Sequence, residues 1–464
     1  MPRARASLLC LLSFLFACAV APARIGEPGE VPVSQPAKPY VPFREFTLKN
    51  GLRVILSEDH AAPTYSICVT YNVGSRDERP GRTGFAHLFE HMMFQGSANV
   101  GKGEHFILIL NNGGSANGTT NADRTNYFET LPANQLELGI FLEADRMRAL
   151  NVTEANFTNQ RHAVQEERRL NYDNRPYGRT FETIIETAYD NFAYKHSTIG
   201  SMKDLNAAGI EDASAFFKTY YAPNNAVLSL VGDFQGDTAL TLVKKYFESI
   251  PSQTSPPAPD MTEPEQSGER RKTMEDAFAQ APRLDLVYKT APGNTSDWYA
   301  LLALGHIMGG DLSSRLYQKL VKELEMVVRV SAGPDERRGR SLFSVSLVVR
   351  PDRNLHEVER LVYEEIESLK NQPVSDWELD KVRMKLRLQQ AQNLYSTRAR
   401  ANALGHYAVY YNEPELINTV LDKIAQVNKA DLQRVARTYL KADSRTVVTT
   451  SPKSKAASAA PADG

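Results

Sequence analysis

His87-Leu88-Phe89-Glu90-His91 is the stretch of this 464-residue chain that carries the most information. On an α-helix, residues four apart lie on one face, so His87 and His91 can hold the same metal ion. Glu90 lies beside His91, where its carboxylate can take a proton from a water molecule at that ion. Two imidazoles leave a zinc site incomplete. The stretch therefore predicts a helix that needs a third metal ligand from elsewhere in the chain.

The composition is typical of a soluble globular protein with more than one domain. Apolar residues make up 42% of the chain and charged residues 23%. A chain of this length exceeds one ordinary core, and two domains of about 200 residues each are expected. The 54 basic and 55 acidic residues nearly cancel. This balance gives no support for a nucleic-acid partner or an anionic membrane surface.

The N-terminus has the form of a secretory signal. Arg3 and Arg5 precede an apolar run at residues 8–20, and Ala21-Pro22-Ala23 has the small-x-small form of a cleavage site. The run is continuous and not amphipathic, which argues against a mitochondrial presequence. Leu15-Phe16-Ala17-Cys18 also resembles a bacterial lipoprotein signal, so a lipid anchor at Cys18 is the alternative. We expect an exported protein, located in the bacterial periplasm, without a transmembrane segment.

Two similar halves follow, separated by a proline-rich stretch. Asn50-Gly51 between two apolar runs predicts a β-hairpin near the start of the first half. Residues 251–268 contain five prolines among polar residues and cannot build a core. The expected organisation is a signal peptide (1–23), an extended arm (24–42), a catalytic zinc-binding domain (43–250), a linker (251–270), a second homologous domain without metal ligands (271–451) and a disordered tail (452–464).

The two halves are interpreted as copies of one α+β unit. Sliding the sequence by 214 residues lays residues 87–96 over residues 301–310, and both segments are apolar helices that follow a strand and a polar loop. Leu301 then faces His87, and Gly305 faces His91. A repeat of this length indicates domain duplication and not a solenoid. The predicted fold is two homologous domains, each a mostly antiparallel sheet with helices packed on one face.

The third metal ligand is expected on a helix that includes residues 160–172. This segment contains two adjacent carboxylates, Glu166 and Glu167. Its spacing alone neither chooses between them nor excludes His162. The neighbouring Arg168-Arg169 is interpreted as a solvated face, with a supporting role beside Glu167 as the alternative.

Here the chain resembles the pitrilysin/insulinase family of zinc metallopeptidases, whose inverted motif is His-x-x-Glu-His. Two-domain members such as mitochondrial processing peptidase subunits and bacterial periplasmic zinc proteases have a similar size. The resemblance covers residues from about 40 to 450. It rests on His87–His91, on Ala163-Val164 three residues before Glu167, on Gly113–Thr120 with Asp123–Tyr127, on Tyr221–Asp233, and on Gly309-Gly310 with Ser314–Leu316.

The resemblance implies a metal site and a reaction. It places the third ligand of one zinc ion at Glu167, and it puts Gln160 where many members have a supporting glutamate. Glu166 is the other residue expected beside the ligands. Glu90 would act as the general base toward a zinc-activated water in a zinc endopeptidase. The alternatives are a non-catalytic core or assembly subunit and a processing peptidase for targeting peptides.

The resemblance also implies how a substrate binds. A peptide or unfolded segment would add as a strand to an exposed sheet edge, through main-chain hydrogen bonds that ignore sequence. The residues expected at that edge are Ser115, Ala116, Asn117, Gly118 and Thr119. Asn117 and Gly118 would lie nearest the scissile bond.

The chain departs from the family in its second half. Active members use an Arg and a Tyr, seven residues apart, to bind substrate and stabilise the oxyanion. Val321 and Val328 stand at those positions here, and neither side chain donates a hydrogen bond. We therefore expect a heterodimer in which a homologous partner without the zinc motif supplies Arg and Tyr. A homodimer and a monomer are the alternatives.

Overall fold

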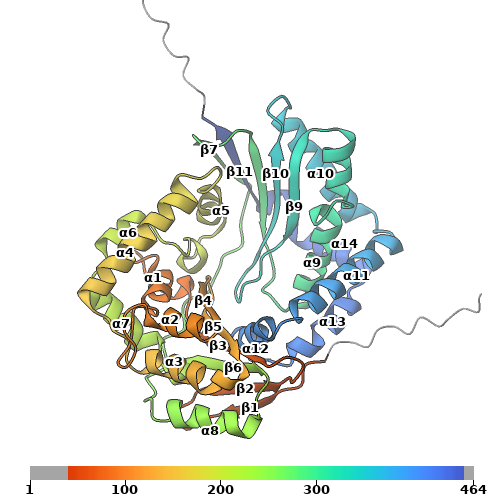
Figure 1. Ribbon diagram of the computed structural model, residues 1–464. Coiled ribbons are helices and arrows are strands. Elements are labelled where there is room, and N and C mark those ends of the chain that lie inside the picture. Colours follow the sequence, from red (N-terminus) through yellow and green to blue (C-terminus); the bar gives the residue numbers. More distant parts are fainter. Residues whose placement is uncertain (1–39, 454–464) are drawn as a thin grey trace, which may run out of the picture. The chain divides into compact units, whose positions relative to one another are not determined.

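The computed structural model describes residues 40–453, so the predicted signal, Cys18 and residues 24–39 of the arm lie outside it, as do residues 454–464. Two sheets organise the described chain (Figure 1). The first has the order β1-β2-β6-β3-β5-β4 and the second the order β7-β11-β8-β10-β9. The strands are β1 (Arg44–Thr47), β2 (Arg53–Glu58), β3 (Thr64–Tyr71), β4 (Ser115–Thr120), β5 (Thr125–Pro132), β6 (Ala226–Gly232), β7 (Arg270–Asp276), β8 (Arg283–Lys289), β9 (Val327–Pro334), β10 (Leu342–Val349) and β11 (Arg445–Pro452).

The strand order confirms the duplication. Without β1, the first sheet runs β2-β6-β3-β5-β4, and the second repeats that connectivity as β7-β11-β8-β10-β9. In each sheet one pair is parallel, β2 with β6 and β7 with β11, and the other pairs are antiparallel. One boundary of the predicted disordered tail is wrong, because Pro452 pairs with Asp276 as the last residue of β11.

In both halves, with β1 left out, helices follow the second and the fourth strand along the chain, but α8 also follows β6 and no described helix follows β11. The first half contains α1 (Phe85–Met92), α2 (Glu104–Asn111), α3 (Leu136–Arg148), α4 (Glu154–Arg168), α5 (Thr180–Ala188), α6 (Met202–Ala207), α7 (Ile210–Tyr220) and α8 (Gly236–Phe247). The second contains α9 (Ser296–Gly309), α10 (Leu355–Asn371), α11 (Asp376–Asn393), α12 (Thr397–Tyr411), α13 (Leu416–Gln426) and α14 (Lys429–Tyr439). Between α9 and β9 the chain forms a π-helical segment, Tyr317–Glu323.

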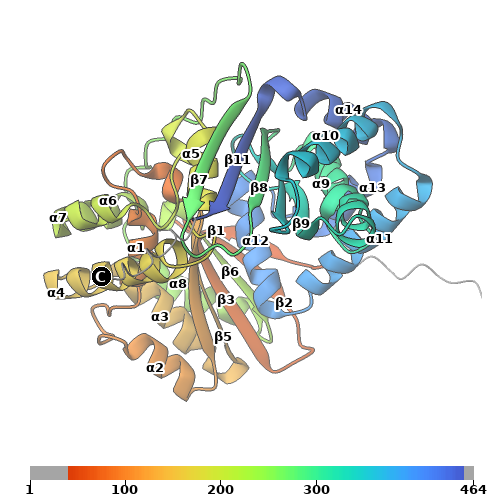
Figure 2. The same cartoon turned by 90° about the horizontal axis from the view of Figure 1, so that it is seen from above.

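One helix of each half packs on the sheet of the other half. The C-terminal-half helix α12 lies against β3 and β6, and the N-terminal-half helix α5 lies against β7, β8 and β11 (Figures 1 and 2). A hydroxyl pair fastens the start of each helix to its sheet. Thr397 lies 2.8 Å from Ser66, and Thr180 lies 2.9 Å from Thr450. The prediction of helices on one face therefore holds for the helices of the same half, while the other half covers the second face.

The local sequence signals act as expected at the start of the first sheet. Gly51 has φ +86°, the left-handed conformation that glycine adopts without a side-chain clash, and it turns β1 into β2. Cys68 of β3 is buried and free. None of the helices in residues 40–453 has the length and apolar character needed to cross a membrane.

Candidate metal centre

The motif helix α1 is amphipathic, and this decides where its polar residues point. Leu88 and Phe89 are completely buried in the core of the first half, whereas His87, Glu90 and His91 are half-buried on the other side. Burial of these apolar side chains is favourable and holds the helix against the core. The three motif residues are therefore presented together on one face, as their spacing predicts.

A buried carboxylate holds the beginning of α1. Glu78 accepts hydrogen bonds from the backbone N–H groups of Gly84, at 2.9 Å, and Ala86, at 2.8 Å. These donors have no partner within the helix, and a negative charge at a helix N-terminus is favourable. His196 lies 3.0 Å from the same carboxylate. Because 118 residues separate Glu78 from His196, no local pattern in the sequence announces this contact.

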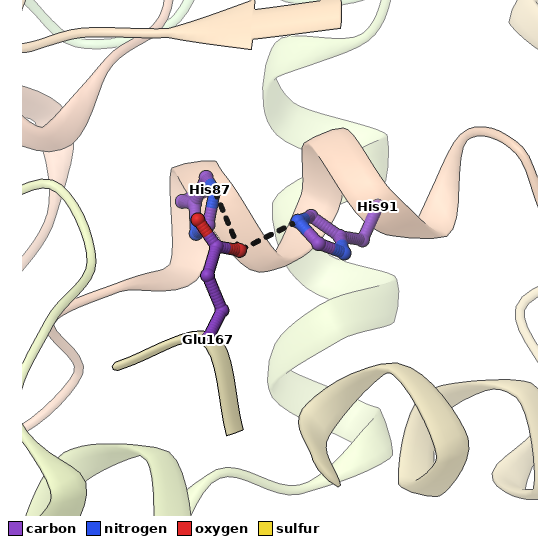
Figure 3. Close-up of side chains that lie close together, drawn as sticks. All are labelled: His87, His91 and Glu167. Carbon is purple, nitrogen blue, oxygen red and sulfur yellow. Dashed lines mark ion pairs between the residues drawn. The ribbon is translucent and has the colours of Figure 1, made fainter. Parts of the chain in front are cut away.

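The third ligand comes from α4. Glu167 directs one carboxylate oxygen, Oε2, at both imidazoles, 3.6 Å from Nε2 of His87 and 3.3 Å from Nε2 of His91 (Figure 3). One ligand atom from each of the three residues lies within 4.8 Å of the others. The structure thus brings together the two histidines and the carboxylate that the family resemblance selects from the Glu166-Glu167 pair.

The three side chains fit a zinc ion. Two imidazole nitrogens and one carboxylate oxygen form a donor set that catalytic zinc sites use, and such sites leave a fourth position open. The donor atoms point at a common place, and none of the three side chains is fully buried. The site therefore remains reachable for a ligand from outside.

The electrostatics favour the ligand forms of two of these residues. Burial lowers the pKa of His87 to about 4, which leaves its imidazole neutral. The hydrogen bond with His91 lowers the pKa of Glu167 and keeps it ionised. Burial alone would lower the pKa of His91, but the hydrogen bond that His91 donates to Glu167 and the nearby Glu90 raise it. A neutral imidazole and an ionised carboxylate are the forms that bind metal.

Glu90 is held beside the ligands by the edge strand β4. Thr120 donates a hydrogen bond of 2.6 Å to Oε2 of Glu90. Gly118 leaves room for the rest of the side chain, since a Cβ there would lie 3.0 Å from Cγ of Glu90. Burial raises the pKa of Glu90. A carboxylate with a raised pKa is suited to accept and return a proton near neutral pH.

The residues expected beside the ligands divide into two groups. Gln160 is buried on α4 and lies within hydrogen-bonding reach of His91. Glu166 is exposed and pairs with Arg169, while His162 is not among the three grouped ligands. Asn171, which the sequence did not single out, hydrogen bonds to Glu167.

The interpretation of Arg168 as part of a solvated face is wrong. Arg168 is buried and donates to the carboxylate of Glu182 on α5, at 2.7 Å and 3.0 Å. It also donates to the carbonyl of Gly200. The ion pair ties the end of α4, next to Glu167, to α5. Arg169 is exposed, as expected.

A second group of candidate ligands lies in the core of the first half. His105, Glu129 and Glu143 are buried and close together. Arg146 lies among them and forms an ion pair with Glu143, with Glu129 3.9 Å away. The guanidinium group supplies the cation in this cluster, so the cluster has no need of a metal ion.

The predicted substrate edge is a true sheet edge. β4 ends the first sheet, and it carries Ser115, Ala116, Asn117, Gly118 and Thr119. The N–H of Gly118 is bonded to the side chain of its own neighbour, Asn117, at 2.9 Å. Side chains alternate along a strand, and Gly118 and Thr120 face Glu90.

The second half offers no Arg–Tyr pair at the positions named above. Val321 is half-buried against the core of the second half. Val328 is 59% exposed and lines a cavity with Asn171 and Arg329. Neither valine can donate to a reacting oxygen.

Comparison with known proteins identifies the family. The model of "Insulinase (Peptidase family M16)" matches residues 53–202, and that of "Peptidase M16 inactive domain" matches residues 208–386. The zinc protease PqqE of Helicobacter pylori is 30% identical over 423 residues, which cover 90% of this chain and 95% of the relative. The chain belongs to peptidase family M16. The M16 model described as inactive falls largely on the half that lacks the motif of His87 and His91.

Other relatives of this M16 chain share its length. The uncharacterized zinc protease YmxG of Bacillus subtilis is 21% identical over 85% of this chain and 95% of the relative. The probable mitochondrial-processing peptidase subunit beta of Schizosaccharomyces pombe is 23% identical over 84% of this chain and 87% of the relative. Two of these named relatives are thus zinc proteases.

Solved structures show the same fold. A protease from Helicobacter pylori has a TM-score of 0.85 at 30% identity, covering 89% of this chain and 100% of that one. The periplasmic protease PqqL from Escherichia coli has a TM-score of 0.73 at 18% identity. This chain covers 48% of PqqL, and it covers 92% of the separately solved first half of that protein. In fold and length it therefore corresponds to one half of PqqL.

Proposed function

We propose that this M16 chain is a zinc-dependent endopeptidase that cleaves peptides or unfolded segments. The observation that carries the proposal is the convergence of His87, His91 and Glu167 beside Glu90, next to the free edge of β4. The zinc protease relatives support the same class of reaction. One zinc ion per chain is proposed, because the second half has no counterpart of these ligands among its described residues.

The residues of this chain have distinct tasks. Zinc, when bound by His87, His91 and Glu167, lowers the pKa of water and polarises the scissile carbonyl. Glu90 takes the proton of the attacking water and delivers it to the leaving amine. Thr120 orients Glu90 through the 2.6 Å hydrogen bond. Gln160 and Asn171 orient His91 and Glu167.

β4 holds the substrate. An extended peptide that adds to this edge gains main-chain hydrogen bonds whatever its sequence. Its scissile bond then lies at the level of Asn117 and Gly118, since Gly118 contacts Glu90. Folded proteins do not offer such a strand, so peptides and unfolded segments are the substrate class.

A homologous partner chain is proposed to complete the site. An oxyanion donor contributes a factor of about 100 to 1,000 in rate, and Val321 and Val328 cannot provide one. The partner would supply Arg and Tyr and would lack the zinc motif. The correspondence of this chain to one half of PqqL is consistent with such a division. We also propose export to the periplasm, on the basis of the N-terminal sequence.

The test of the catalytic assignment is a pair of matched substitutions. Glu90→Gln removes the proton acceptor and should abolish cleavage of a peptide mixture while zinc stays bound. Glu166→Gln makes the same chemical change on an exposed carboxylate paired with Arg169, and it should retain both activity and zinc. Undiminished cleavage by Glu90→Gln would refute the assignment.

The partner is tested by adding it. Cleavage should be weak with this chain alone and should rise by a factor of about 100 or more with a homologous chain that carries Arg and Tyr. The same partner with both residues changed to Ala and Phe should give no increase. Full activity of this chain alone would reject the heterodimer.

A further inference from the structure

A cavity of about 600 Å³ lies beside the peptide-binding edge, on the side of β4 that faces away from Glu90. Asn117 and Thr119 of β4 form one wall of it. These two residues alternate with Gly118 and Thr120, which face Glu90. The opposite wall comes from the second half, from the end of α11 and from α12. The cavity is therefore adjacent to the proposed scissile bond.

The charge of this cavity is one-sided. Arg124 and Arg398 line it together with His406, and no carboxylate does. Among the described residues neither arginine has an ion-pair partner. Arg124 donates to the carbonyl of Thr119, at 2.7 Å, and to Asn126, at 2.9 Å. Arg398 makes a cation–π contact with Phe128, 5.7 Å from the ring centre.

Two other cavities of the described chain are lined by both signs of charge, while the cavity beside Val328 has Arg175, Arg283 and Arg329 in its lining and no carboxylate. One combines Arg76 with Asp77, Glu78 and Asp260, and another combines Lys289 and Arg340 with Glu265. In the cavity beside β4, His406 has a carboxylate neighbour, Glu336 at 3.3 Å, but Glu336 is not part of the lining. Two unneutralised guanidinium groups facing one concave space attract an anion.

A bound peptide strand would direct alternate side chains to the two sides of β4. Strand addition continues the pleat of the sheet, so neighbouring side chains of the peptide point in opposite directions. A side chain at the level of Gly118 faces Glu90 and the metal ligands. The adjacent side chain, at the level of Asn117 or Thr119, faces the cavity with Arg124 and Arg398.

We propose that this cavity is a specificity subsite that takes an aspartate or glutamate side chain of the substrate. The acidic residue lies next in sequence to the residue that faces Glu90. Arg398 is the main determinant, because it makes no hydrogen bond within residues 40–453 and can reach a carboxylate. Gln390, Asn393 and Asn402 supply further polar groups around it. The inference rests on the proposed binding of peptides along β4.

The test measures peptide binding, so that it does not depend on the partner chain. Zinc-loaded Glu90→Gln chain is titrated with labelled extended peptides of one sequence, in which Glu, Gln or Lys is placed at each position in turn. At one position the peptide with Glu should bind about tenfold more tightly than the peptide with Gln, because a charge-assisted hydrogen bond contributes about that much affinity. Lys should bind more weakly than Gln at that position.

Substitutions in the same background locate the subsite. Adding Arg398→Gln should remove the preference for Glu, and adding Arg398→Glu should replace it with a preference for Lys. Lys244→Glu is the control with the same change of charge. Lys244 is exposed on α8, which packs with α3 and β2 and lines no part of the cavity, and its substitution should leave the preference for Glu unchanged.

The outcomes separate this inference from the proposed function. In one outcome the unsubstituted chain with its partner cleaves the peptides, but the Glu and Gln forms of each peptide bind with equal affinity. This outcome overturns the subsite and leaves the proposed peptidase function in place. A preference for Glu that survives Arg398→Glu also overturns the subsite. If no peptide in the series is bound or cleaved, both the proposed function and the subsite are refuted.

Discussion

The two halves of the molecule place a helix beside an edge strand and fill that contact in opposite ways. In the first half, Gly118 of β4 leaves space for Glu90 of α1. In the second half, Gly305 of α9 leaves space for the backbone of β9, since a Cβ on Gly305 would lie 2.5 Å from the Cα of Gly333. Gly305 is the residue that faces His91 when the sequence is shifted by 214 residues. At the position where the first half has the metal ligand His91, the second half has Gly305, and the backbone of β9 fills the space beside it.

The difference shows how one fold supports a site in one copy only. Leu301 and Leu304, opposite His87 and Glu90, are completely buried in the core of the second half. Polar side chains at these positions would be buried without partners, at a cost of several kcal/mol. The strand pairing is common to both copies, so the site depends on a few helix positions and on the width of the helix–strand contact.

The largest effect is expected from closing the space beside Glu90. Gly118→Val places a branched side chain where a Cβ already lies 3.0 Å from Cγ of Glu90, so the carboxylate must move. A displacement of about 1 Å in a reacting group costs about 100-fold in rate. We expect kcat to fall by about that factor at unchanged zinc content, measured by steady-state cleavage and metal analysis. Unchanged kcat would show that Glu90 does not depend on this space.

The matching change in the second half should affect stability instead. Gly305→Ala forces the backbone of Gly333 away, because their contact leaves no room for a methyl group. Overpacking of this kind costs about 1–3 kcal/mol. Denaturant unfolding should show that loss, while the folded variant keeps its zinc and its activity. A loss of zinc without a loss of stability would contradict the division of roles between the halves.

The exchanged helices provide a smaller and symmetric test. Thr180 and Thr397 each hydrogen bond to a hydroxyl of the other half's sheet. Replacing either by Val should lower the free energy of unfolding by about 1 kcal/mol, since one hydroxyl partner is lost. Chemical denaturation of both variants measures this. A loss of unfolding free energy in only one of the two variants would contradict reciprocal packing of the halves through both hydroxyl pairs.

The smallest expected effect is a pH dependence of the free energy of unfolding that arises from a buried carboxyl group of the first half. Burial raises the pKa of Glu143 to about 8, from a usual value of 4.5. Its contribution to stability is thus fully present below the usual pKa and is lost as the pH rises through about 8.

Thermal unfolding across this range measures the effect. The midpoint should fall between about pH 5 and about pH 8, and Glu143→Gln should flatten that slope because the amide imitates the protonated acid. Glu137→Gln, an exposed position on the same helix, should leave the slope unchanged. A slope that survives Glu143→Gln would assign it to another group.

Local patterns predicted the parts of the molecule that depend on nearby residues. The spacing of His87, Glu90 and His91 indicated one helical face, and the apolar residues between them indicated which face is buried. Asn50-Gly51 predicted a turn. The internal repeat predicted two homologous sheets, and both copies keep the same order of strands.

Contacts between distant segments could not be predicted in this way. Glu78 and His196 meet at the start of α1 although no spacing rule joins them. Arg168 is charged and stands next to an exposed arginine, yet Glu182 and Gly200 make it a buried anchor. The exchange of α5 and α12 follows from packing between the halves. The choice of Glu167 over Glu166 came from resemblance, since adjacent residues differ only in the direction that the folded helix gives them.

The number of zinc ions bound to the purified chain is the decisive measurement. We predict one zinc ion per chain, held by the first half alone. Glu167→Gln should lose it under conditions in which the neighbouring Glu166→Gln retains it, with both variants folded by circular dichroism. One zinc per chain that persists in Glu167→Gln, or a second zinc in the wild-type chain, would contradict a single site built from His87, His91 and Glu167.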